Sequence, residues 1–86
     1  MVSEICRFLG IVIAIYYRDH EPGHFHATYG EYEVTVGIAD GLVKGEFPRR
    51  ALALLMEWYQ LHKAELKQNW ELARERKPLK RIAPLE

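Results

Sequence analysis

The sequence predicts an α+β fold in which a small antiparallel sheet of three to four strands packs against one long helix or two shorter ones. Residues 7–45 are rich in Val, Ile, Tyr and Gly, whereas residues 48–76 are rich in Leu, Ala, Glu, Lys and Arg. Strands followed by helix, rather than alternating with it, favour an antiparallel sheet. The chain has 86 residues and no internal repeat, so we expect a single domain (1–86) with an extended tail at 78–86.

The first expected strand is RFLGIVIAIYY, at 7–17, which is apolar at nearly every position rather than at alternate ones. A strand of this kind is covered on both faces or lies at the centre of a sheet. The segment DHEPG ends it, because Pro22 has no backbone donor and Gly23 tolerates a positive φ.

The next two strands are predicted to form a hairpin, HFHATY and YEVTVG, with Gly30 and Glu31 as the turn. Glycine in the first central position suits a type II′ turn, and this turn sets the register of the two strands. Side chains alternate along a strand, so His24 and His26 share one face, about 6.5–7 Å apart at the backbone. The opposite face then pairs Tyr29 with Tyr32, Ala27 with Val34, and Phe25 with Val36.

A turn at Asp40-Gly41 is expected to lead into a short fourth strand at Leu42–Lys44. The helical half begins with Pro48, which suits the first position of a helix. One unbroken helix over 48–76 would be about 43 Å long at 1.5 Å per residue, which is long for this chain. We therefore expect a kink or a break near residues 60–63.

The composition excludes several classes of protein. Twelve Lys and Arg balance twelve Asp and Glu, which argues against a strongly basic nucleic-acid module. Cys6 is the only cysteine, so a disulfide within the chain and a cysteine-only zinc site are excluded, and a reducing cytoplasm is the expected location. The longest apolar run, residues 9–17, is far below the roughly 20 residues that span a bilayer, so no membrane role is expected.

Six segments point to a known family: RFLGI, YYRDHEPGHFHATYGEYE, EFPRRAL, EWYQLHKAEL, NWELA and PLKRIAPLE. Together they cover nearly the whole chain, and in them it resembles a bacterial family called domain of unknown function 4160. The resemblance implies a small cytoplasmic bacterial protein that acts with a partner encoded nearby, in a toxin–antitoxin-like or regulatory pair. It assigns no catalytic residue. Gly23 stands where a second proline is expected, a change that would loosen the loop that carries His20.

The histidines are the strongest functional signal. His20, His24 and His26 lie within seven residues of a chain that has four histidines in all. A His-x-His pair on a strand presents two imidazoles to one side, and His20 or Asp19 in the preceding loop could supply a third ligand, with water as the fourth. If a metal binds there, a divalent ion such as zinc is expected, and nickel or copper would accept the same ligands.

Two other interpretations of the histidines stay open. His24 and His26 are also candidate catalytic residues, a metal-free base and acid for cleavage of RNA by its 2′-hydroxyl, with Arg18 nearby to contact phosphate. Alternatively, they are polar side chains that hydrogen-bond Thr35 and Glu33 on a solvated face. His62, by contrast, falls on the apolar stripe of the helix and is expected to pack there.

Weaker signals concern partners. The apolar first strand exceeds what the rest of the chain can cover, which predicts a homodimer or a heteromer through the sheet edge, the aromatic helix or the tail. We interpret the protein chiefly as a component that acts through such a partner, with the histidine face as its functional surface. The C-terminal region also carries a basic cluster, which suits a helix C-terminus and, less strongly, contact with RNA or DNA phosphate: Arg74, Arg76, Lys77, Lys80 and Arg81.

Overall fold

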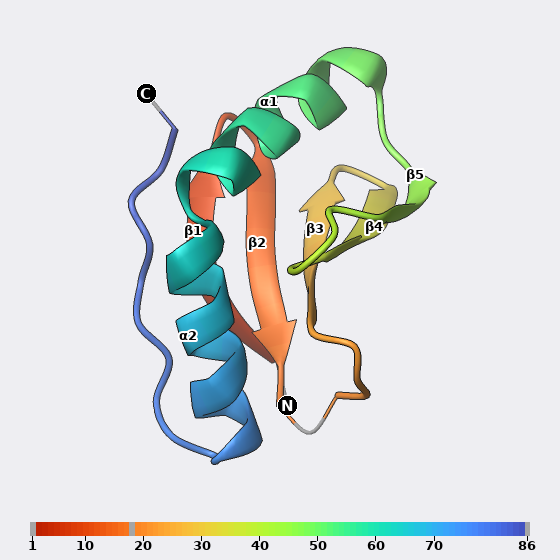
Figure 1. Ribbon diagram of the computed structural model, residues 1–86. Helices are drawn as coiled ribbons and strands as arrows, with labels where there is room; N and C mark the ends of the chain where they lie inside the picture. The colour runs from red at the N-terminus through yellow and green to blue at the C-terminus, as the bar shows by residue number, and fades with distance from the viewer. Residues whose placement is uncertain (1, 18, 86) are drawn as a thin grey trace.

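The computed structural model describes residues 2–17 and 19–85 and contains a five-stranded antiparallel sheet with two helices on one of its faces (Figure 1). The strand order follows the chain order from β1 to β5, and each strand is antiparallel to its neighbours. The α+β prediction is confirmed, but the sheet has five strands instead of three to four. The strands are β1 (Val2–Phe8), β2 (Ile11–Tyr16), β3 (His24–Tyr29), β4 (Tyr32–Gly37) and β5 (Val43–Glu46).

The additional strand comes from the segment 7–17, whose prediction as a single strand was wrong. Leu9 and Gly10 form a turn between β1 and β2, with φ angles of 49° and 85°. Two consecutive positive φ angles are the geometry of a tight hairpin turn. Glycine adopts a positive φ freely. Leucine rarely does, so its presence at the turn gave no indication in the sequence that the apolar run is divided there.

The second hairpin is paired as the sequence predicts. Gly30 has a φ of 59°, and the observed register pairs His24 with Gly37, His26 with Thr35 and Phe25 with Val36. Phe25 is fully buried on the face that the helices cover. The last strand is shifted from its expected position at 42–44 and forms the edge of the sheet.

β2 is apolar on both faces, but it lies beside the central strand rather than at the centre. Ile11, Ile13 and Ile15 are completely buried in the core. On the opposite face, Val12 is only partly buried and Tyr16 is exposed. The helices therefore cover one of the two apolar faces of this strand.

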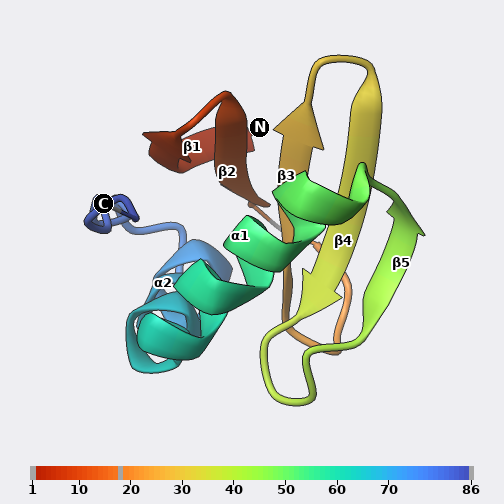
Figure 2. The same ribbon diagram turned by 90° about the horizontal axis from the view of Figure 1, so that it is seen from above.

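The helical half is broken at His62, within the segment where the break is expected. α1 (Arg49–Leu61) crosses the sheet diagonally, and α2 (Lys63–Arg74) lies against β1 and β2 (Figures 1 and 2). Their apolar stripes fill the core with large side chains, among them Trp58 and Leu66, which are completely buried. In the part of the chain that is described, no helix combines the length and the apolar character needed to cross a membrane.

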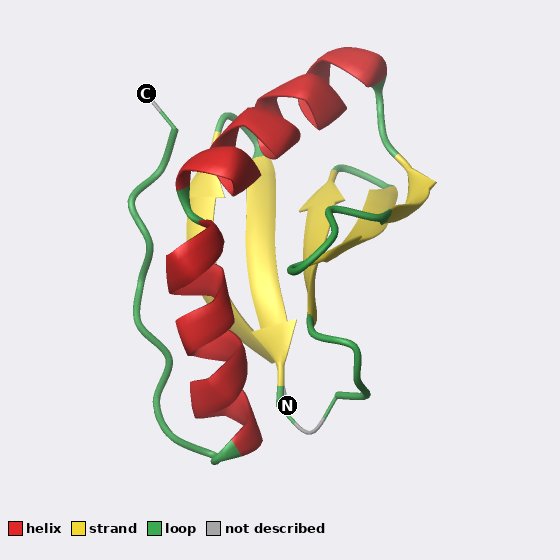
Figure 3. Ribbon diagram, viewed as in Figure 1, coloured by secondary structure: helices red, strands yellow, loops and turns green. Residues whose placement is uncertain are grey.

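The tail runs in extended form beside α2 and the edge of β1, as Figure 3 shows. Ile82 is buried, and its backbone N–H donates to the carbonyl of Ile5 at 2.9 Å. The buried amide of Asn69 accepts a hydrogen bond from the N–H of Lys80 and donates one to its carbonyl, at 2.9 and 2.8 Å. The tail is thus part of the folded structure and helps to close the core.

Candidate functional site

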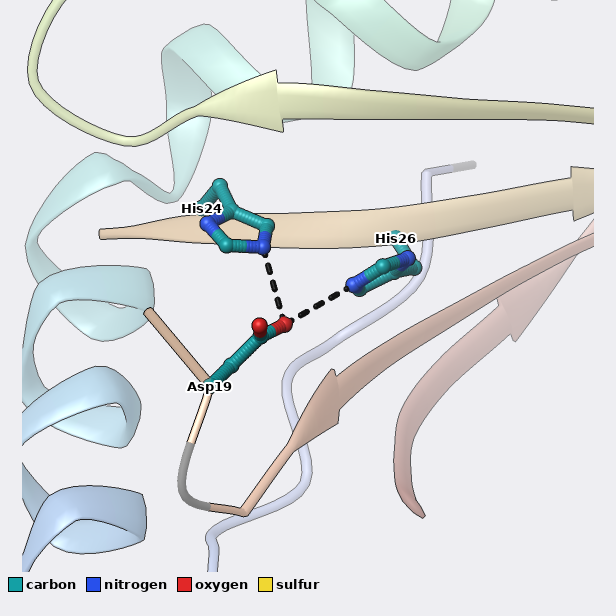
Figure 4. A group of neighbouring side chains, drawn as sticks. All are labelled: Asp19, His24 and His26. Carbon is teal, nitrogen blue, oxygen red and sulfur yellow. Dashed lines mark hydrogen bonds and ion pairs between the residues drawn. The ribbon is translucent and has the colours of Figure 1, made fainter. Parts of the chain in front are cut away.

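Two histidines and one aspartate meet on the face of the sheet that the helices leave uncovered (Figure 4). His24 and His26 project from β3, and Asp19 reaches them from the loop between β2 and β3. The Oδ2 atom of Asp19 lies 2.9 Å from Nε2 of His24 and 3.1 Å from Nε2 of His26. The three side chains each offer one ligand atom, and these atoms lie within 4.8 Å of one another.

The strand register is the reason that both histidines reach this face. Phe25 between them is fixed in the core, so its two neighbours must project to the other side. The face is more sheltered than a solvated one, since the side chains of His24, His26 and Asp19 are 21%, 15% and 19% exposed. The ring of Tyr16 stacks on His26 with 3.9 Å between ring centroids and provides part of this shelter.

The second nitrogen of each imidazole also has a partner. Nδ1 of His24 lies 2.9 Å from the carbonyl oxygen of Pro22, and Nδ1 of His26 lies 3.3 Å from a carboxylate oxygen of Glu33. Both partners are hydrogen-bond acceptors, so each imidazole has an acceptor at both of its nitrogens. Both rings are oriented with Nδ1 outward and Nε2 toward Asp19.

The two acceptors around each ring call for a positive charge. A neutral imidazole carries one proton only, so it can donate to only one of its two acceptors. Its other nitrogen then presents a lone pair to the lone pairs of an acceptor, which is unfavourable. Either protons on the rings or a shared metal cation resolves this arrangement.

The charge of Asp19 supports the same conclusion. Burial tends to raise the pKa of the Asp19 carboxyl, but hydrogen bonds from His26, the backbone N–H of His20 and His24 outweigh it and lower this pKa below its usual value. Asp19 therefore stays ionised at neutral pH and supplies a negative charge to the centre of the group.

The loop that carries Asp19 is anchored to α2. The carboxylate of Glu21 accepts a hydrogen bond from the indole N–H of Trp70 at 3.2 Å and pairs with Arg74 at 2.9 Å. Gly23 lies so close to Trp70 that a Cβ there would be 3.2 Å from the indole, and its carbonyl accepts a hydrogen bond from the N–H of Ile38. The contacts of Gly23 thus hold the loop at a place where a loosened loop was expected.

The other predicted site residues within the described parts of the chain are not among the converging ligands. The side chain of His20 is exposed and is not among the three converging ligands, although its backbone contacts Asp19. Arg18 lies outside the described residues. In the basic cluster, Arg74 and Lys77 form ion pairs with neighbouring acids, and Arg81 pairs with Glu4. Arg76 and Lys80 are exposed.

Trp70 is the contributor to the site that sequence reasoning did not find. Its ring centroid lies 5.3 Å from that of His24, although the two residues are far apart in the chain. In the sequence, Trp70 has only the helical spacing of a core aromatic residue. No local pattern connects it to the histidines, because their contact arises from the packing of α2 against the loop.

Comparison with known proteins identifies the family but no characterised relative. No curated protein matches the chain, and no solved structure does. The model of one family, described as a domain of unknown function (DUF4160), matches residues 10–71, which include all three converging ligands and most of both helices. The resemblance seen in the sequence is confirmed, and the chain belongs to the DUF4160 family.

Proposed function

We propose that this protein binds a divalent transition metal ion, such as zinc, through Asp19, His24 and His26. The observation that carries the proposal is the orientation of the two imidazoles. Both Nε2 atoms face one carboxylate oxygen, while both Nδ1 atoms face an acceptor on the outer side. Metal-bound histidines typically show this pattern, because the outer hydrogen bond fixes the ring and makes the ligating nitrogen more basic.

The spacing of the donors suits such an ion. In a tetrahedral site with bonds of about 2.0 Å, neighbouring donor atoms are about 3.3 Å apart. The distances from Asp19 Oδ2 to the two Nε2 atoms, 2.9 and 3.1 Å, are slightly shorter than this, and all three donor atoms lie within 4.8 Å of one another. Two histidines and one carboxylate are a ligand set that zinc uses and that iron(II) also accepts.

Three protein ligands leave at least one coordination position open. In zinc proteins this position holds water or substrate at catalytic sites, whereas structural sites are closed by four protein ligands. The side chains of the three ligands are 15–21% exposed, so the open position can be reached from solvent. A donor atom from a partner protein could occupy the open position, which connects the metal proposal with the partner role expected from the sequence.

Metal titration of the purified protein tests this proposal. After chelation and dialysis, isothermal titration with zinc and absorption spectra with cobalt(II) should show one site per chain. His24→Ala and His26→Ala should each abolish binding, because the remaining ligands hold zinc poorly. His62→Ala is the matched control, since His62 contacts Glu65 and Trp58 instead and should leave metal binding intact.

Substitutions in the loop test which of its two candidate ligands, Asp19 or His20, binds the metal. Asp19→Asn keeps the size of the side chain but removes its charge, and it should weaken binding by at least tenfold. His20→Ala should have little effect, since that ring is outside the group. Equal metal binding by the wild type and the two site histidine variants would refute the proposal.

A second candidate function, metal-free cleavage of RNA by the histidine pair, rests on the same contacts. Two imidazoles whose rings are 5.2 Å apart and share one carboxylate could act as acid and base. Cleavage that persists in a chelator, shows a bell-shaped pH profile and disappears in His24→Ala and His26→Ala would favour this function. Cleavage lost on chelation would favour the metal.

A further inference from the structure

A second concave site lies on the other side of the Asp19 loop, between α2 and the segments that flank β3 and β4. It is a cleft of about 520 Å³, large enough for a small organic molecule. Its exposed rim consists of charged side chains, whereas its inner surface is apolar. Gly23, Ile38 and Trp70 form the inner surface, and the exposed Ala39 and Ala64 extend the apolar lining outward.

The rim of the cleft is unevenly charged. Its two acids, Glu21 and Glu71, both lie near Arg74, at 2.9 and 3.9 Å. Lys63 and Lys67 are exposed, and neither forms an ion pair with any carboxylate in the described parts of the chain. The cleft therefore presents two lysines without carboxylate partners above an apolar surface.

These two lysines repel each other in the absence of an anion. They are four residues apart on α2, so their side chains are neighbours on one helix face, where like charges are unfavourable. Both lysines line the cleft, and the Nζ of Lys63 also lies over the ring of Tyr59, 5.3 Å from its centroid. An anion between the two ammonium groups would relieve the repulsion.

The start of α2 also bears on the charge at the cleft, and its first turn holds one acid, Glu65, which contacts the imidazole of His62. The helix begins at Lys63, and no side chain caps its first turn. Its first backbone N–H groups, including that of Ala64 in the cleft wall, have no acceptor within the helix. The helix dipole thus favours negative charge at the same end of the cleft as the lysines.

We propose that this cleft binds a small amphipathic anion, with an apolar body against Trp70 and Ile38 and a carboxylate or sulfonate between Lys63 and Lys67. The indole of Trp70 and the branched side chain of Ile38 set the preference for an aromatic or branched body, and the lysines set the preference for one negative charge. The two sites share Trp70, whose ring also contacts His24, but Lys63 and Lys67 are outside the metal ligand group, and the test below is therefore made without metal.

The two tryptophans provide an internal comparison for the test. The indole N–H of Trp70 donates to Glu21 in the cleft wall, whereas that of Trp58 donates to the carbonyl of Ala83 outside the cleft. In ¹H–¹⁵N spectra recorded with EDTA, 4-phenylbutyrate should shift the Trp70 indole signal and leave that of Trp58 in place. The neutral 4-phenylbutanamide, matched in size, should bind at least roughly fivefold more weakly.

Substitutions then test the two parts of the site. Replacing both lysines by glutamine should weaken 4-phenylbutyrate binding roughly five- to tenfold and leave the amide unaffected. Arg50→Gln, at an exposed position on α1 outside the cleft, is the charge-matched control and should change neither ligand. Ala64→Trp should fill the cleft and block both ligands, and a near-ultraviolet circular dichroism spectrum verifies that each variant is folded.

Three results would overturn the proposal. The first is the absence of a Trp70 shift at millimolar 4-phenylbutyrate. The second is equal binding of the acid and the amide, which would show that the lysines take no part. The third is a shift of the Trp70 signal on simple dilution without ligand, which would show that a second copy of the chain occupies the cleft.

Discussion

Replacing Asn69 by alanine should release the C-terminal tail from α2. Asn69 is 1% exposed, and its side-chain amide makes both of its hydrogen bonds to the backbone of Lys80, at 2.8 and 2.9 Å. Through these bonds a single side chain fixes the point at which the tail begins to run along β1. Ile82, two residues further, is then placed in the core.

The expected loss in the free energy of unfolding follows from these contacts. Each hydrogen bond contributes about 0.5–1.5 kcal/mol net, so the pair is worth about 1–3 kcal/mol. If the tail stays in place, its Lys80 groups lose their partners, and if it leaves, part of the burial of Ile82 is lost. A total loss of about 2–4 kcal/mol is expected. That is a large part of the roughly 4–13 kcal/mol typical of a domain of this size.

Urea unfolding followed by circular dichroism measures this loss, and hydrogen exchange at the Ile82 N–H reports whether the tail detaches. The melting temperature should fall by about 10–25 °C. Gln68→Ala is the matched control, because Gln68 is an exposed amide one position earlier in the same helix and should cost less than about 0.5 kcal/mol. Equal stability of the two variants, with the Ile82 N–H still protected, would refute the role assigned to Asn69.

Metal affinity should fall when the solution is acidified from about pH 7.5 to about pH 5.5, because protons compete with the ion for the ligating nitrogens; calorimetric titration measures it, and an unchanged affinity would contradict the histidine ligands. Burial raises the pKa of Tyr59, whose hydroxyl donates to the carbonyl of Ile38 at 2.7 Å. The raised pKa means that its contribution to stability is complete below the unfolded-state pKa of about 10 and is lost as the pH rises through the folded-state value. Tyr59→Phe should therefore flatten the decline in the free energy of unfolding between about pH 9 and pH 11, and parallel declines in the variant and the wild type would refute this account. The wild type should associate at micromolar concentration, and Val12→Lys on the uncovered face should make it monomeric in light scattering; a wild type that is already monomeric and recovers no partner would count against the expected association.

The histidine hairpin shows how far local pattern alone can predict a structure. Gly30 permits the turn, and alternation then places Phe25 inside and its histidine neighbours outside. Each step involves residues within one hairpin, so the prediction needs no knowledge of the rest of the chain. The break near His62 was predicted differently, from the length of the helix in relation to the size of the chain.

The first hairpin shows the limit of this approach. The turn at Leu9 requires a positive φ at a residue that usually avoids it, and the burial of both flanking strands stabilises it. Turn residues are predictable when their own chemistry favours the turn. Here the surrounding contacts favour it instead, and these contacts become visible only in the folded protein.

The candidate site was likewise predictable from the sequence only in part. The sequence by itself determined that His24 and His26 share a face and that Asp19 or His20 is near enough to join them, because strand alternation and a short loop dictate both. Only the tertiary structure decided that Asp19 is the one that joins them, and that Trp70 and Glu21 hold its loop against α2. The physical reason is that side-chain direction within a strand depends on neighbours in the chain. The position of a loop depends on the element against which it packs, and here that element is a helix some fifty residues further along.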